Sequence, residues 1–219
     1  MDVGKKIKKI FAPEDLNQHW DRLATCYFQK KDFLSYLHKY NPSNQRYYEF
    51  YTNNHLVAGA VIYTLRINFL TFANLTSHVK MQVIGLPVSV STSGIIGDPS
   101  EFKDFLNEIF RLEKGLILGL NLFENFHHDK AVNMRTLPSI LLRRSFNSWE
   151  GYIKSLKSRY RRRLNRIQIK YDGVDSVNGD CKSFTNEHYI QYLEIMKRTK
   201  TKLETLSYEF FKNLPINFR

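Results

Sequence analysis

Apolar residues near the start of the chain recur every three or four positions, which is the spacing of helices buried along one side. Pro13 and two acidic residues open the first such segment, and its apolar positions continue to Tyr27, so we expect a helix there. A second helix is expected over Asp32–Tyr40, with Asp32 as its N-cap and Asn41-Pro42 as its end.

Segments rich in β-branched and aromatic residues follow these helices. Residues 46–52 and 56–69 flank Asn53-Asn54. Because asparagine tolerates a positive φ, this pair favours a hairpin turn between two strands. Residues 79–86 predict a third strand.

The next segments predict one helix and two further strands. Residues 100–114 place their apolar residues on one side of a helix that ends at Gly115. Residues 116–123 are almost continuously apolar, as in a strand buried on both faces, and 136–143 predict one more strand, which Pro138 restricts to an edge. This order of helices and strands predicts an α/β or α+β fold with a mixed sheet flanked by helices.

A long amphipathic helix is expected from Trp149 to Tyr171, with Ser148 as its N-cap and Glu150 in its first turn. Apolar side chains form one stripe along this helix, and we expect the stripe to be packed while the cations face outward. The stripe consists of Trp149, Ile153, Leu156, Tyr160, Leu164, Ile167 and Tyr171.

Two more helices are expected after a polar connection over 172–183, one at 186–200 and one at 203–214. Like the opening pair, they end with aromatic residues and a proline, so we expect them to open a second copy of the first domain, with its sheet missing. The expected division is a first domain, a basic linker and a truncated second domain, with boundaries 1–147, 148–183 and 184–219.

Composition is that of a globular protein, because 42% of the 219 residues are apolar and 14% are aromatic. Cys26 and Cys181 are far apart and lack the spacing of a zinc site, so we expect neither a metal nor a disulfide framework. No apolar run has the length of a membrane span or signal peptide, which predicts a cytoplasmic protein and leaves peripheral contact with a membrane open.

The net charge of +12 is concentrated on the predicted basic helix, where residues 149–171 carry eight Lys or Arg against one Glu. Such a concentration favours an anionic partner: a phosphate-bearing small molecule, RNA or an acidic surface. A solvated face without a ligand is the alternative interpretation. The candidate anion-binding residues recur at spacings of three and four and therefore share a face; they are Arg159, Arg162, Arg163 and Arg166.

The string Phe146-Asn-Ser-Trp-Glu-Gly-Tyr-Ile-Lys-Ser-Leu-Lys-Ser-Arg-Tyr-Arg-Arg-Arg-Leu-Asn-Arg166 resembles the linker of the Fem-like and BioF2-like branch of the GNAT acyltransferase superfamily. The stretch Tyr189–Leu214 is similar to the segment after that linker in the same family. The resemblance covers residues 45–219. It implies two tandem GNAT-like domains that transfer an acyl group from acyl-CoA, or an aminoacyl group from aminoacyl-tRNA, to an amine or hydroxyl acceptor.

One motif of that family is incomplete. GNAT enzymes hold the pyrophosphate of coenzyme A on a loop Arg/Gln-x-x-Gly-x-Gly/Ala at a helix N-terminus. The segment Gln82–Pro87 matches only the first four positions. In two-domain relatives the second domain often carries the donor site, so we expect this chain to be inactive without its missing C-terminal domain.

Polar groups gather in the loop 87–97 and after the strand at 116–123, at strand ends where ligands of α/β sheets tend to bind. Polar loops also occur for structural reasons alone. His127-His128-Asp129 offers a general base, although adjacent loop residues diverge. The candidate binding residues at the strand ends are Ser91, Thr92, Ser93, Gly94, Asn121 and Glu124.

Two functions therefore remain open. One is an acyl- or aminoacyl-transferase module in which catalysis rests on positioning and on hydrogen bonds to the developing oxyanion, with no catalytic residue assigned. The other is a non-catalytic module that binds RNA or an anionic surface through the arginines.

Overall fold

The computed structural model describes residues 4–68, 78–88, 91–122, 131–134, 146–175, 179–199 and 204–215. The chain divides into two units. Unit 1 consists of Met1–Thr136 together with Asp180–Arg219, and unit 2 of Leu137–Gly179. Among the described residues, no helix combines the length and apolar character needed to cross a bilayer.

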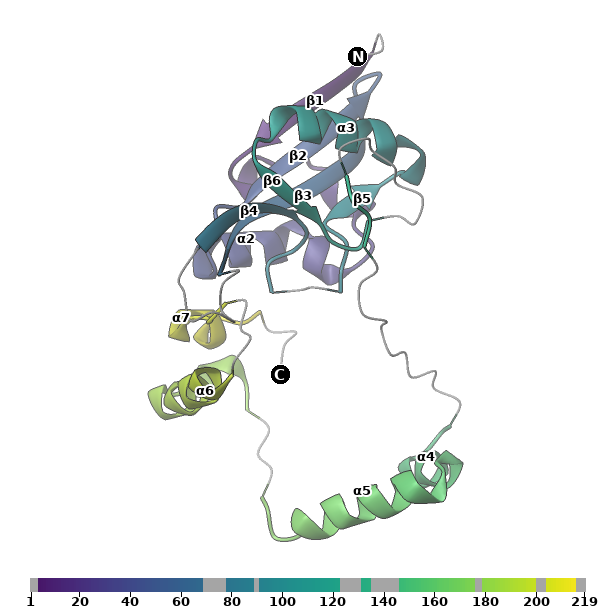
Figure 1. The fold of residues 1–219 in the computed structure, drawn as a ribbon, viewed down its shortest axis with the longest axis vertical. Helices are drawn as coiled ribbons and strands as arrows, with labels where there is room; N and C mark the ends of the chain where they lie inside the picture. Colours follow the sequence, from purple (N-terminus) through teal and green to yellow (C-terminus); the bar gives the residue numbers. More distant parts are fainter. Residues whose placement is uncertain are drawn as a thin grey trace. The chain divides into compact units, whose positions relative to one another are not determined.

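A mixed six-stranded sheet forms the centre of unit 1 (Figure 1). The strand order is β1-β2-β3-β4-β6, with β5 paired to β3, and every pair is antiparallel except the parallel pair β4–β6. The expected mixed α/β fold is thus confirmed. The strands are β1 (Lys5–Ile10), β2 (Arg46–Thr52), β3 (His55–Asn68), β4 (His78–Ile84), β5 (Ile95–Gly97) and β6 (Leu116–Gly119).

The predicted hairpin joins β2 to β3. Asn53 and Asn54 have φ values of 50° and 63°, which are the left-handed values that the tight turn needs. The register then pairs Thr52 with His55 and Arg46 with Ile62, with a bulge near Phe50.

Helices cover both faces of the sheet (Figure 1). On one face, α3 (Phe102–Leu112) buries Phe105, Leu106 and Ile109 against Tyr48 of β2. On the other face, Trp20 and Leu34 pack with Tyr47. These two residues belong to α1 (Trp20–Leu23) and α2 (Lys31–Tyr40). Because side chains alternate along a strand, the neighbours Tyr47 and Tyr48 serve opposite cores.

Three expectations for unit 1 are corrected by the structure. Residues 13–27 do not form one helix. The backbone forms two short helical turns and becomes extended after each, at Leu16 and at Ala24. Asp32 lies in the first turn of α2, whose N-cap is Lys30. Of the expected strand at 116–123, described as far as residue 122, only Leu116–Gly119 form a strand, β6, and it is not buried on both faces, since Leu116 is 52% exposed.

The sequence analysis also missed β1 and β5. The lysine-rich β1 lies at an edge of the sheet, beside β2. β5 has only three residues, which is too short for an alternating pattern to identify. The strand expected at 136–143 lies outside the described residues.

Unit 2 contains two helices, not the single long helix that was expected. Helix α4 (Trp149–Ser155) is followed by two residues with extended backbone, Leu156 and Lys157. Helix α5 (Ser158–Lys170) begins directly after them. At the break, the Ser155 hydroxyl donates a hydrogen bond to the Tyr152 carbonyl, a contact that competes with helix continuation. The predicted N-cap is confirmed, since the Ser148 hydroxyl accepts from the Gly151 N–H at 3.0 Å.

The last described segment contains α6 (Asn186–Arg198) and α7 (Tyr208–Lys212). Phe210 of α7 is buried with Phe33, Tyr36 and Leu37 of α2, and the Tyr36 hydroxyl donates to the Phe210 carbonyl. The second predicted helix is shorter than expected, because residues 204–207 are not helical. Whether this segment opens a second domain stays a prediction.

Candidate functional site

The parallel pair β4–β6 and the intervening α3 form a strand–helix–strand unit. In α/β sheets, ligands bind outside the carboxyl ends of parallel strands, where loops enter and leave the helices. Here β4 ends at Ile84 and β6 at Gly119, and the Leu120 N–H still donates to the Ile84 carbonyl at 3.0 Å. The residues just beyond these two ends are therefore the natural walls of a binding site.

A loop leaves the sheet after β4 and returns as β5. Its two ends pair with one residue of β3, because the Gly85 N–H donates to the Val61 carbonyl and the Val61 N–H donates to the Gly94 carbonyl, at 3.1 and 2.8 Å. A Cβ at Gly94 would lie 2.4 Å from the amide nitrogen of Gly85, so this close approach requires glycine. We call this closed base the glycine neck.

Gln29 ties the loop to the helical face of unit 1. Its side chain is buried, and its Nε2 donates to the Ser93 carbonyl at 3.0 Å. Its Oε1 accepts from the N–H and hydroxyl of Thr25 at 2.8 and 2.9 Å, and from the Cys26 N–H at 3.3 Å. One amide therefore fixes two chain segments in place around the same space.

A pocket of about 480 Å³ lies at this position, a volume typical of small-molecule sites. Hydroxyl and amide side chains share its lining with an apolar wall, and none of its described lining residues is Asp, Glu, His, Lys or Arg. The polar part consists of Thr25, Gln29, Ser91, Thr92, Ser93 and Asn121. The apolar part includes Ile95, Ile96, Pro99, Phe102 and Leu122.

The helical turn that leads into α3 borders the pocket at Pro99, but its anion position is already occupied. The Asp98 carboxylate accepts from the Ser100 N–H and hydroxyl at 2.9 and 2.8 Å, and the N–H hydrogen bond is the main cause that lowers the pKa of Asp98. Two further carboxylates, Glu101 and Asp104, lie near Lys5 Nζ at 3.2 and 2.6 Å. A phosphate would meet negative charge here, so the pocket suits the uncharged part of a ligand.

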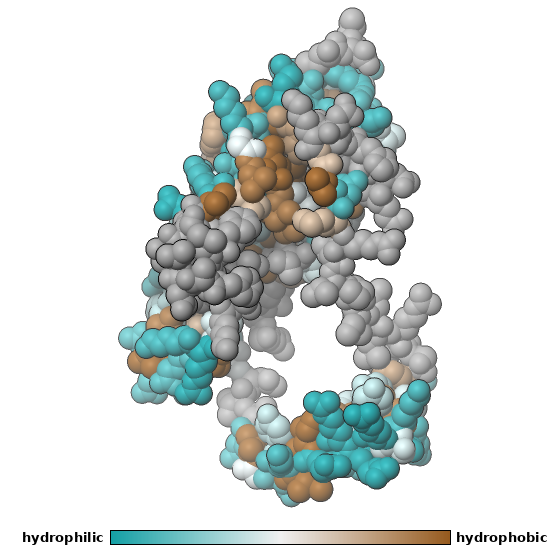
Figure 2. Space-filling model, in the orientation of Figure 1, coloured by the Kyte–Doolittle hydropathy of each residue, from teal (hydrophilic) through white to brown (hydrophobic). Residues whose placement is uncertain are grey.

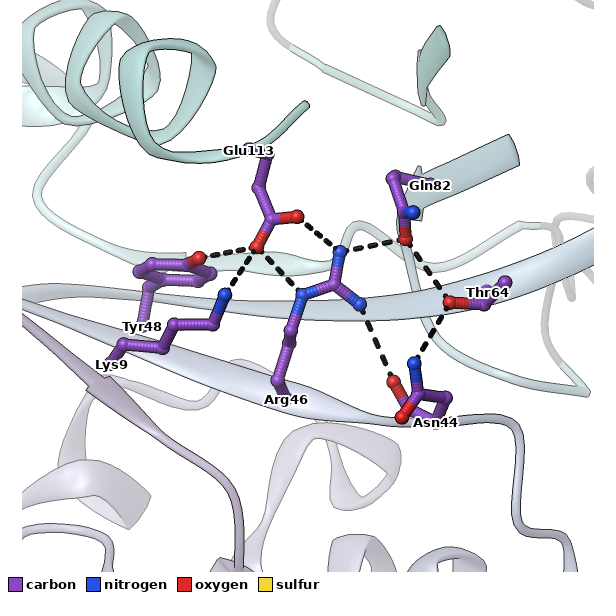
Figure 3. Close-up of polar contacts among 7 residues, drawn as sticks. All are labelled: Lys9, Asn44, Arg46, Tyr48, Thr64, Gln82 and Glu113. Carbon is purple, nitrogen blue, oxygen red and sulfur yellow. Dashed lines mark hydrogen bonds and ion pairs between the residues drawn. The ribbon is translucent and has the colours of Figure 1, made fainter. Parts of the chain in front are cut away.

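A second polar cluster lies beside the C-terminal end of α3 (Figure 3). The guanidinium of Arg46 binds the Glu113 carboxylate through Nε and Nη2, at 2.6 and 2.5 Å, and both side chains are buried. Lys9 and the Tyr48 hydroxyl also donate to Glu113, and Gln82 accepts from Arg46 at 2.7 Å. The carboxylate oxygens and the guanidinium thus already have protein partners, so this cluster ties α3 to the sheet and leaves Glu113 no evident role in binding.

The four candidate arginines lie on α5 in unit 2, and all are exposed. Within the described part of the chain, none of them forms an ion pair with a carboxylate. Their place relative to the pocket is not defined, because the two units are described separately. The structure shows a free cationic helix but does not join it to the pocket. These four are Arg159, Arg162, Arg163 and Arg166.

The other candidates fall into three groups. Ser91, Thr92, Ser93 and Asn121 line the pocket, and Gly94 forms the neck of its loop. Glu124 and the His127-His128-Asp129 stretch lie outside the described residues. Sequence reasoning missed Gln29 and Arg46 because their roles depend on partners far away in the chain. For Arg46, the sequence offered one signal of a special role, namely a charged residue at the start of a strand rich in aromatic residues.

No family model matches the sequence, and neither a curated protein nor a solved structure matches the chain. Among the described residues, no group of three or more His, Cys, Asp or Glu side chains is arranged to hold a metal ion.

Proposed function

We propose that unit 1 belongs to an acyl- or aminoacyl-transferase and that its pocket holds the acyl-bearing end of the donor. The observation that carries this proposal is the pocket itself. It lies at the carboxyl ends of the only parallel strand pair among the described residues, and polar hydrogen-bonding groups lie there beside an apolar wall. The resemblance of residues 146–166 to the Fem-like linker supports the same reaction class.

The pocket offers binding and orientation, and its described lining contains no Asp, Glu, His, Lys or Arg, although the thiol of Cys26 is part of it. In the proposed reaction an acceptor amine attacks the carbonyl carbon of the donor. The thiolate of coenzyme A, or the ribose oxygen of tRNA, leaves and takes up the proton that the amine loses. Asn121, Ser91 and Thr92 are the polar lining residues to which we assign the orientation of the carbonyl and of its developing oxyanion.

Calorimetric titration of the full-length protein with acetyl-CoA and with an aminoacyl-tRNA tests this proposal. We expect one of the two donors to bind, and the variant Ser91→Phe to weaken that binding by more than about tenfold, because a ring at this lining position takes up part of the pocket. Asn107→Phe is the matched control, since Asn107 is exposed on α3 and is not part of the pocket lining. Absence of binding by both donors, or equal binding by Ser91→Phe, would overturn the proposal.

A second candidate function is binding of RNA or another anionic surface through α5. The specific observation is that its four arginines are exposed and unpaired with carboxylates in the described part of the chain. If about four of them contact phosphates, affinity for single-stranded RNA should fall about 50-fold between about 50 and 200 mM salt. The triple variant Arg159→Ala, Arg162→Ala, Arg163→Ala should lose most of this salt dependence in a fluorescence-anisotropy titration, and an unchanged slope would exclude α5 as the site.

A further inference from the structure

Unit 2 exposes apolar side chains as well as cations. Trp149, Tyr160 and Tyr171 are 54, 54 and 67% exposed, and Ile167 is 42% exposed. The apolar stripe that was expected to be packed is therefore largely accessible to solvent. Figure 2 shows hydrophilic residues over much of α5 with apolar residues between them. An exposed apolar surface beside a charged one indicates a binding face.

The two kinds of side chain form adjacent rows on α5. Tyr160, Leu164, Ile167 and Tyr171 recur at spacings of four, three and four. The row formed by Arg159, Arg163, Arg166 and Lys170 is the same pattern shifted by one residue. Since consecutive residues of an α-helix lie about 100° apart, the cationic row runs directly along one side of the apolar row.

The aliphatic members of the exposed face distinguish between anionic partners. RNA is bound by cations and by aromatic rings that stack on bases, and it would leave the exposed Ile167 of the apolar row in water. A phospholipid surface accepts both kinds of group, because aliphatic and aromatic side chains enter the interface while Arg and Lys reach the lipid phosphates. The combination on α5 thus matches a lipid surface better than a nucleic acid.

We propose that unit 2 binds anionic phospholipid membranes, with α5 lying parallel to the membrane surface, its apolar row in the interface and its cationic row on the headgroups. The exposed Trp149 at the start of α4 provides a second interfacial contact, as tryptophan favours this region of the bilayer. This inference rests on the second candidate function, binding of an anionic surface by α5. It is independent of the pocket in unit 1.

Sedimentation with lipid vesicles tests the inference. The protein should bind vesicles of phosphatidylcholine containing about 30 mol% phosphatidylserine and should bind pure phosphatidylcholine at least about tenfold more weakly, because cations near an anionic surface add to the affinity. Raising the salt concentration should weaken the binding, since the phosphate–arginine attraction is screened.

Two sets of substitutions separate the contributions of charge and apolar contact. Arg159→Gln, Arg163→Gln and Arg166→Gln together should weaken vesicle binding roughly 100-fold. Tyr160→Gln with Ile167→Gln should weaken it about tenfold or more, because the apolar contact with the interface is lost. Glutamine is a good helix former, and a circular dichroism spectrum checks that α5 persists.

A matched control removes the same charge elsewhere. Lys8, Lys80 and Lys103 are exposed in unit 1, and replacing all three by Gln should leave vesicle affinity within about twofold of the unsubstituted protein. If this control loses as much affinity as the α5 arginine variant, binding follows overall charge and the inference is wrong.

Tryptophan fluorescence reports the contact directly. The chain has two tryptophans, of which Trp20 is fully buried and Trp149 is exposed. Vesicles should shift the emission to the blue, lipids with a quencher in the acyl chain should quench it, and Trp149→Phe should abolish both effects.

The outcomes separate this inference from the candidate function on which it rests. Binding to RNA without binding to anionic vesicles would overturn the membrane proposal and retain α5 as an RNA site. Absence of binding to both would overturn both. Vesicle binding that survives the Tyr160→Gln/Ile167→Gln double substitution would exclude interfacial insertion.

Discussion

Glu113 in unit 1 accepts hydrogen bonds from three side chains, and these set the pKa of its carboxyl group. Burial by itself raises the pKa of a carboxyl group, but hydrogen bonds from Arg46, Tyr48 and Lys9 outweigh this and lower the pKa of Glu113 to about 2. Because this pKa is lower in the folded than in the unfolded chain, ionised Glu113 stabilises the fold above the ordinary value near 4.5. That stabilisation is lost as the pH falls from about 4.5 towards about 2.

Replacing Glu113 with Gln should lower the free energy of unfolding at pH 7 by about 3 kcal/mol, because the buried guanidinium of Arg46 then lacks a counter-charge. Urea unfolding at several pH values measures the effect. The difference between the original and substituted proteins should shrink as the pH approaches about 2, where Glu113 becomes protonated.

Glu108→Gln is the control for this prediction. Glu108 pairs with Arg111 at 2.6 Å, but the Arg111 side chain is 65% exposed, so water screens the pair. Its loss should change stability by less than about 1 kcal/mol. A Glu113→Gln effect no larger than that of the control would show that the buried cluster contributes little to stability.

Among the elements, α7 has the contact most open to a direct test. Phe210 is 6% exposed, and its ring centroid lies 5.2 Å from that of Tyr36 in α2. Phe210→Ala should lower the free energy of unfolding by about 3–5 kcal/mol, because packing against α2 is lost, and should release the C-terminal segment from α2. Limited proteolysis should then cut within residues 180–215 much faster than in the original protein.

Ile195→Ala is the control for this experiment, because Ile195 lies on α6 and is 65% exposed. Its cleavage rate should equal that of the original protein. Equal cleavage rates for Phe210→Ala and Ile195→Ala would contradict a contribution of α7 to holding the segment on unit 1.

Elements with a strong local signal could be predicted from the sequence. The Asn53-Asn54 pair identified the hairpin, and the apolar side of α3 identified that helix nearly to its ends. The failures have local causes too. A hydroxyl–carbonyl contact at Ser155 accompanies a break in a helix whose apolar spacing continues across it, and spacing alone does not reveal such a break.

At the scale of the whole molecule, the charge excess is local. The α5 helix carries the four exposed candidate arginines, whereas Arg46 in unit 1 is buried beside Glu113. The cationic face of α5 could be predicted from the sequence, since a run of cations on a helix needs no distant partner to be recognised. The buried pair could not be predicted, because Arg46 and Glu113 meet only after the sheet and α3 pack together.

The residues of the candidate site, too, could be predicted only in part from the sequence. Ser91 to Ser93 and Asn121 were predicted as binding residues from their places after strands, and the structure brings them to one pocket. Their chemical role stays a prediction. Gln29, which holds the loop in place, lies between the two helices expected at the start of the chain, where no apolar spacing indicates its partners.

The glycine neck separates the hydrogen bonds that hold the loop on the sheet from the side chains that line the pocket. Because Gly85 and Gly94 both pair with Val61, the sheet continues from β4 to β5 across the base of the loop. The lining residues Ser91 and Thr92 are carried beyond that base, so their identities can vary while the hydrogen bonds of the neck are kept. For the ligand site that we propose here, variation in this loop should therefore alter ligand preference without redesign of the scaffold, which makes it a natural position for grafting new specificities.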